Sequence, residues 1–144
     1  MANSYGYFLI ATLAGVAVAL QGQFMGAMNR HVGTATTMLI TYGSGAILSA
    51  LLWLAVRSRA TDTSAVPWYA WSAGALGLII VGGIGYAAPR FGLSRTLVIT
   101  VAAQLIAAML IEHFGLAGAT ARRIDPTKLA GVCLTVAGVW LAVK

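Results

Sequence analysis

The chain has 144 residues, of which 60% are hydrophobic and only 8% are charged, and its formal net charge is +6. Soluble domains contain about 45–50% apolar residues, so this composition predicts a polytopic membrane protein. The positive charge does not predict nucleic-acid binding, because the basic residues lie between apolar segments and not on one soluble face. A single cysteine, Cys133, excludes a disulfide framework within the chain.

Five apolar segments follow one another, and each is long enough to cross a hydrocarbon core about 30 Å thick as a helix. The pattern predicts an all-α fold with five transmembrane helices in a single transmembrane domain, residues 1–144. The first segment lacks the basic start of a signal peptide and is expected to be a retained span. The spans are expected at residues 5–28, 34–56, 67–87, 92–113 and 127–143.

Glycine and proline mark points where these spans can pack closely or end. Gly43-Ser44-Gly45 lies near the middle of the second span, where it could break the helix to serve a site or permit packing; packing is the preferred interpretation. The third span contains five glycines and is interpreted as a helix that its neighbours approach closely. Pro89 predicts the break before the fourth span.

The fourth span carries one amide near its middle, Gln104. An amide at that depth finds no water, so it is expected to face other helices or a wet cavity. Thr100, Gln104, Ala107 and Ile111 share one helical face, and this strip is interpreted as the side turned toward the protein interior. The alternative is that Gln104 only holds two helices together.

An internal repeat with an offset of 59 residues relates the first two spans to the third and fourth. Gly33 aligns with Gly92, and the segment Thr37–Thr41 aligns with Thr96–Thr100. Both hairpins start on the same side of the membrane, so the repeat is parallel and not inverted. The fifth span has no counterpart in it.

The basic residues are almost evenly divided between the two sides of a five-span protein, and their bias sets orientation. A division of five against four favours neither orientation, so we expect insertion both ways and an antiparallel two-fold homodimer of ten helices. The alternative is one fixed orientation with a different, paralogous chain as partner. One side carries Arg57, Arg59, Arg122, Arg123 and Lys128, and the other carries Arg30, Arg90, Arg95 and Lys144.

The last span contains GVCLTVAGV, residues 131–139, in which Gly131, Thr135 and Gly138 form a flat strip and Leu134 can act as a knob. This segment resembles the dimerisation helix of small multidrug resistance transporters. ALQGQFMGAMNRHVG in the first span and AAQLIAAMLIEHFGL in the fourth resemble the five-helix YdcZ-like branch of the drug/metabolite transporter superfamily.

The resemblance covers essentially the whole chain. It implies a carrier in the bacterial inner membrane with five helices per half, working by alternating access as a homodimer or a paired heterodimer. Small multidrug transporters couple protons through a glutamate in their first span. Here the nearest polar groups are Gln21 and Gln23, so neither that mechanism nor a preference for cations is expected.

The candidate substrate-binding residues are amides, which offer donors and acceptors without charge, flanked by arginines, which favour an anionic group. They predict a small polar or weakly anionic metabolite as substrate. The alternative is that the amides join helices and the arginines meet lipid headgroups. These residues are Gln21, Gln23, Asn29, Gln104, Arg30 and Arg95.

Three acids are present, and Glu112 is the one near hydrocarbon. It is the candidate for proton coupling, or else a partner for a basic residue. Asp62 lies in a polar loop, and Asp125 precedes Pro126 at a position where helix capping is expected. The sequence shows no metal-binding cluster and no nucleophile–base pair, so neither a cofactor nor enzyme activity is expected.

Two other functions compete with that of a metabolite carrier. Subunits of lipid-linked sugar flippases resemble the same superfamily, so the chain could be one of them. It could also be an accessory subunit that transports nothing and stabilises a partner. The lipid bilayer is the common surrounding in all three hypotheses.

Overall fold

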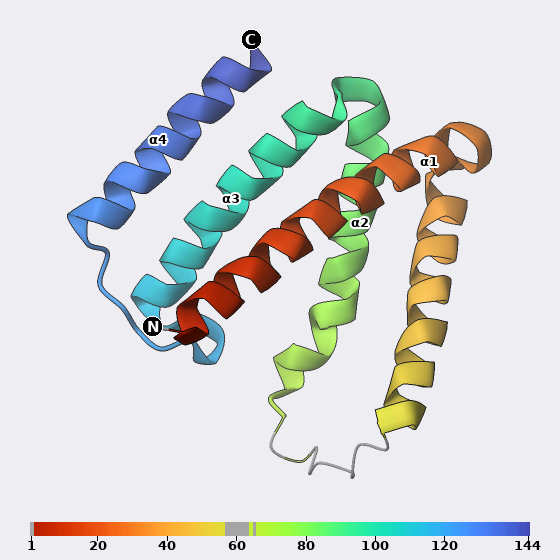
Figure 1. Ribbon diagram of the computed structural model, residues 1–144, viewed down its shortest axis with the longest axis horizontal. Helices are drawn as coiled ribbons and strands as arrows, with labels where there is room; N and C mark the ends of the chain where they lie inside the picture. The colour runs from red at the N-terminus through yellow and green to blue at the C-terminus, as the bar shows by residue number, and fades with distance from the viewer. Residues whose placement is uncertain (1, 57–63, 65) are drawn as a thin grey trace. The chain divides into compact units, whose positions relative to one another are not determined.

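The computed structural model describes residues 2–56, 64 and 66–144 (Figure 1). Arg57, Arg59 and Asp62, which the sequence places in a polar loop, lie outside these residues. The chain divides into two compact units, one that ends at Pro89 and a second, Arg90–Lys144.

The regular structure of the described residues is entirely helical, in agreement with the predicted all-α class. Four of these helices are long and apolar enough to cross a membrane. They are α1 (Ala2–Val56), α2 (Ala73–Phe91), α3 (Leu93–Phe114) and α4 (Pro126–Val143), with short 3-10 helices η2 (Trp68–Ser72) and η3 (Leu116–Gly118) between them.

The helix α1 is interrupted at Gly33, where φ is 78° and ψ is 168°. An L-residue with a side chain rarely adopts this conformation, whereas glycine does so readily. Figure 1 shows α1 reversing its direction, so that it forms two arms, residues 2–32 and 34–56. The predicted soft point at Gly43-Ser44-Gly45 does not break the second arm, which stays helical through these residues.

The glycines of α2 admit both arms of α1. Methyl groups added at Gly82 and Gly85 would lie 3.0 Å from the Met38 sulfur and 3.1 Å from the Met25 methyl carbon. At Gly77 a methyl group would overlap the Tyr42 hydroxyl. The expectation that neighbouring helices approach this segment closely is confirmed.

The prediction that the chain breaks at Pro89 is wrong. Pro89 lies inside α2, which continues to Phe91, and the break falls at Gly92. Proline removes the hydrogen bond that its own N–H would make to the carbonyl four residues earlier, and its ring crowds that carbonyl. Here a donor from another helix replaces that bond, so the helix continues.

The repeat predicted from the sequence reappears as local geometry at the two turn glycines. Gly33 and Gly92 both have positive φ, 78° and 96°. Thr37 donates its hydroxyl to the Gly33 carbonyl at 2.8 Å, and Thr96 donates to the Gly92 carbonyl at 2.9 Å. Each turn is therefore built by the same pair, a glycine and the threonine four residues later.

In the second unit α3 packs against α4. A left-handed Gly115 ends α3, and the Arg122 N–H donates to the Glu112 carbonyl at 2.8 Å, which returns the loop to the end of that helix. Asp125 caps α4 by accepting from the Lys128 N–H at 2.8 Å, and Pro126 follows at the first helical position. The predicted capping role of Asp125 is confirmed.

Candidate functional site

A polar hollow of about 510 Å³ lies in the first unit. Its wall comes from both arms of α1 and from α2. The second arm contributes a series at helical spacing, so those side chains share one face. The lining residues are Gln21, Thr41, Tyr42, Gly45, Ala46, Ser49 and Val81.

The Thr41 hydroxyl is a buried polar group in the wall of this hollow. Its Oγ1 atom is buried and has no hydrogen-bond partner among the described residues. Buried hydroxyls are normally paired, and an unpaired one costs free energy. The exposed Gln21 amide offers both donors and acceptors to a molecule that enters the hollow, and the unpaired Thr41 hydroxyl belongs to a residue of the same wall.

Two other polar side chains of the hollow, Ser49 and Tyr42, have defined neighbours. Ser49 donates its hydroxyl to the Gly45 carbonyl at 2.8 Å and keeps its oxygen lone pairs free to accept. The Tyr42 ring lies against Gly77, so the missing side chain of that glycine sets the ring's position. The lining contains no charged residue, which suits a polar but uncharged ligand.

Asn29, a predicted substrate-binding residue, is engaged within the protein. Its Nδ2 donates to the Gly85 carbonyl at 2.7 Å, and its Oδ1 accepts from the Thr34 hydroxyl at 3.0 Å. Gly85 is four residues before Pro89, so Asn29 supplies the donor that the proline lacks. This amide joins the arms of α1 to α2.

The other predicted site residues do not join the hollow. Gln23 is exposed on the first arm, about 200° around the helix from Gln21. Gln104 is exposed on α3 and finds no hydrogen-bond partner in the part of the chain that the structure describes. Arg30 is exposed near the first turn, and the Arg95 guanidinium lies 5.8 Å from the centre of the Phe91 ring.

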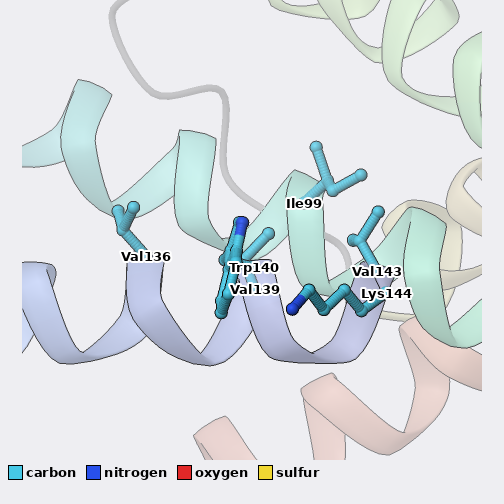
Figure 2. Close-up of a pocket in the computed structure, with 6 residues that line it drawn as sticks. All are labelled: Ile99, Val136, Val139, Trp140, Val143 and Lys144. Atoms are coloured by element: carbon cyan, nitrogen blue, oxygen red, sulfur yellow. The ribbon is translucent and has the colours of Figure 1, made fainter.

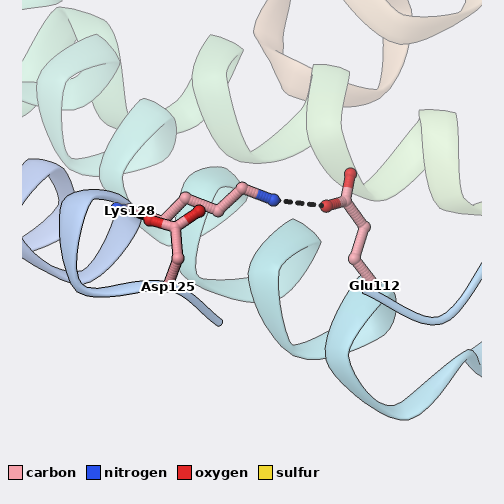
Figure 3. Close-up of polar contacts among 3 residues, drawn as sticks. All are labelled: Glu112, Asp125 and Lys128. Atoms are coloured by element: carbon pink, nitrogen blue, oxygen red, sulfur yellow. Dashed lines mark hydrogen bonds and ion pairs between the residues drawn. The ribbon is translucent and has the colours of Figure 1, made fainter. Parts of the chain in front are cut away.

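Glu112 is paired with a basic residue. Its Oε2 lies 3.4 Å from the Lys128 ammonium, and both side chains are nearly half exposed (Figure 3). Glu112 lines a groove between α3 and α4 that Gln104 does not reach. Leu105, the next residue, lines this groove and points about 100° away from Gln104 around the axis of α3. The helical strip that contains Gln104 therefore does not face α4.

The predicted dimerisation strip of α4 divides into two parts. Gly131 and Thr135 line the groove toward α3. Leu134 is 74% exposed, and a methyl group added at Gly138 would meet nothing within 4 Å. Leu134 and Gly138 are thus uncovered among the described residues and can contact another protein surface.

The far end of α4 carries a second, apolar groove of about 410 Å³. Figure 2 shows the Lys144 side chain near the Trp140 ring, and its ammonium lies 4.2 Å from the ring centre. A cation beside a tryptophan is a common anchor at a membrane interface. With Lys128 near the other end, the apolar part of α4 is bracketed by positive charges.

The family model described as "Putative inner membrane exporter, YdcZ" matches residues 6–141. The chain belongs to this family. As a YdcZ-family protein it is a multi-pass transporter of an inner membrane, in agreement with the resemblance found in the sequence. No curated protein and no solved structure matches the chain.

Sequence reasoning missed three residues of the hollow in this YdcZ-family chain: Thr41, Tyr42 and Ser49. A signal existed, because these hydroxyls recur at helical spacing within an otherwise apolar span. Hydroxyls in a membrane helix often donate to a backbone carbonyl of their own helix, as Thr37 does. Sequence alone does not distinguish such hydroxyls from those that line a hollow. Among the described residues no group of three or more metal-ligating side chains occurs.

Proposed function

We propose that this chain transports a small, polar, uncharged metabolite across the bacterial inner membrane, and that the hollow lined by Gln21 and Thr41 binds it. The buried, unpartnered Thr41 hydroxyl carries the proposal. A volume of about 510 Å³ suits a small metabolite. A weakly anionic substrate is less well served, because the lining offers no cation.

The chain crosses the membrane five times in this proposal, once with each arm of α1 and once with each of α2, α3 and α4. The whole of α1 is too long for one crossing. Its arms, residues 2–32 and 34–56, measure roughly 45 and 35 Å at 1.5 Å per residue, against about 30 Å for the hydrocarbon core.

Two oppositely oriented copies form the working unit, an antiparallel homodimer of ten helices that operates by alternating access. The nearly even division of basic residues, five against four, supports insertion in both orientations. On α4 the exposed Leu134 supplies a knob, and Gly138 supplies open space, for packing against the second copy. In this dimer Glu112 is the candidate for proton coupling. We expect Glu112→Gln to abolish substrate accumulation driven by a pH gradient.

The substrate site is tested with purified protein in liposomes and a panel of labelled polar metabolites. We expect Gln21→Leu and Thr41→Val to lower transport about tenfold, which corresponds to about 1.4 kcal/mol of lost interaction. Gln23→Leu is the matched control, because it removes the same amide from the same arm but outside the hollow. Equal losses in Gln21→Leu and Gln23→Leu contradict the site, and no transport of any solute by the parent chain contradicts the function.

The topology is tested with single cysteines in a Cys133→Ala background. Ala35 and Thr120 are exposed. Ala35 follows the turn at Gly33, and Thr120 lies in the connection between α3 and α4, which a five-span chain holds on the opposite side of the membrane. For a dual-topology protein each cysteine reacts with an impermeant reagent from both sides in comparable amounts. Reaction of each cysteine from one side only excludes dual topology.

A further inference from the structure

The groove between α3 and α4 combines a charged mouth with an apolar floor. It measures about 450 Å³, and its mouth carries Glu112, Arg122 and Lys128. The rest of it is lined by Leu105, Ala108, Met109, Gly131, Val132 and Thr135. This groove lies within the second unit, whereas the polar hollow of the proposed substrate site lies within the first.

The mouth has an unbalanced positive charge. Lys128 shares its ammonium with Glu112 at 3.4 Å, so these two charges offset each other. The backbone N–H of Arg122 donates to the Glu112 carbonyl, but the Arg122 guanidinium has no partner among the residues that the structure describes. The three side chains therefore sum to one positive charge, with a guanidinium fork free to bind an oxyanion.

The charged and apolar parts of the groove follow one another along α3 and α4 in the same order as the headgroup and the acyl chains of a phospholipid. Glu112 is near the end of α3 and Lys128 near the start of α4, so the mouth lies where both helices meet one interface. Leu105 is seven residues before Glu112, which places the floor about 10 Å deeper at 1.5 Å per residue. A phospholipid whose phosphate lies at the mouth would place an acyl chain along the floor.

We infer that this groove binds one anionic phospholipid, with its phosphate on Arg122 and Lys128 and one acyl chain against Leu105, Met109 and Val132. The single excess charge matches one phosphodiester. A free phosphate ion would use the mouth alone and would gain nothing from the apolar floor. A zwitterionic lipid would bring a cation that Arg122 repels.

The test titrates phosphatidylglycerol and phosphatidylcholine separately into the purified full chain in an uncharged detergent, with one-to-one complexes counted by native mass spectrometry. We expect phosphatidylglycerol to bind more tightly, and Arg122→Gln to weaken it about fivefold. Glu112→Gln should strengthen it by a similar factor, because the variant frees the Lys128 ammonium. Millimolar inorganic phosphate should not displace the lipid.

Arg123→Gln is the matched control, because it removes an equal charge from the neighbouring residue, which does not line the groove. It should change the affinity less than about twofold, since detergent carries no charged bilayer surface to which a general positive charge responds. Equal losses in the two arginine variants overturn the site. So do displacement by inorganic phosphate, equal binding of both lipids, and weaker binding in Glu112→Gln.

Discussion

The side-chain amide of Asn29 donates a 2.7 Å hydrogen bond to the carbonyl of Gly85, four residues before Pro89. Proline has no N–H, so this carbonyl lacks the partner that an uninterrupted helix provides. In a membrane such a group finds no water, and a neighbouring helix must satisfy it. Pro89 of α2 and Asn29 of α1 therefore depend on each other: the asparagine supplies the hydrogen bond that the proline removes.

This relationship predicts the outcome of a double-mutant cycle. Asn29→Leu should lower the free energy of unfolding by about 1–2 kcal/mol, because it leaves the Gly85 carbonyl unpaired. Pro89→Ala restores the missing N–H, so the same Asn29→Leu change should cost clearly less in that background. Unfolding in mixed micelles measures both values. Strict additivity of the two changes contradicts the pairing.

The contact between Gly77 and Tyr42 predicts a second effect, on transport. In Gly77→Ala the added methyl group overlaps the Tyr42 hydroxyl and should push the ring into the polar hollow, with a loss of transport of about tenfold or 1.4 kcal/mol. Tyr42→Phe removes the overlapping oxygen and should partly restore transport in the double variant. The control is Gly83→Ala, where the added methyl meets nothing within 4 Å. Similar losses in both alanine variants would refute this explanation.

Gly138 offers a clean test of the proposed dimer. A methyl group added there meets nothing within 4 Å, and Gly138 is exposed, so Gly138→Leu should leave the fold of one copy unchanged. It should separate the dimer, with a dissociation constant raised at least about tenfold, because close packing of small residues is lost. Single-molecule photobleaching in liposomes measures the fraction of dimers. Gly74→Leu, also in open space, is the control; a dimer unaffected by Gly138→Leu locates the interface elsewhere.

Orientation should follow the charge count in opposite directions for two double variants. Arg122→Gln with Arg123→Gln leaves three basic residues against four, and Arg30→Gln with Arg95→Gln leaves five against two. The side richer in Lys and Arg is retained in the cytoplasm. Cysteine labelling at Ala35 and Thr120 should therefore shift toward opposite sides in the two variants, more strongly in the second. An unchanged distribution in both shows that something other than these charges sets the orientation.

The pair of Glu112 and Lys128 should contribute little to stability. Both side chains are nearly half exposed, and ion pairs of that kind are worth less than about 1 kcal/mol. Glu112→Gln and Lys128→Gln should each change the free energy of unfolding by less than about 1 kcal/mol, with little coupling between them. A much larger coupling, measured in the same micelle assay, means that another surface covers this pair in the assembled protein.

The sequence by itself determined the all-helical class and the start of one helix. Apolar length requires helices, because a membrane leaves no other way to satisfy the backbone of a single span. Gly33 lies between the first two predicted spans and adopts a backbone conformation that only a residue without a side chain adopts easily, and Asp125 before Pro126 marks a helix start. All of these features depend on residues close together in the chain, so local chemistry suffices to predict them.

Only the tertiary structure decided which polar groups are available. Asn29 and Gln21 are both amides of one helix arm, yet the first is bound to Gly85 and the second lines the hollow. The proline was misread as a break because its replacement donor lies 56 residues before Gly85 in the chain. Which amide meets which carbonyl depends on how the helices pack. That packing joins residues far apart in sequence, and no local pattern encodes it.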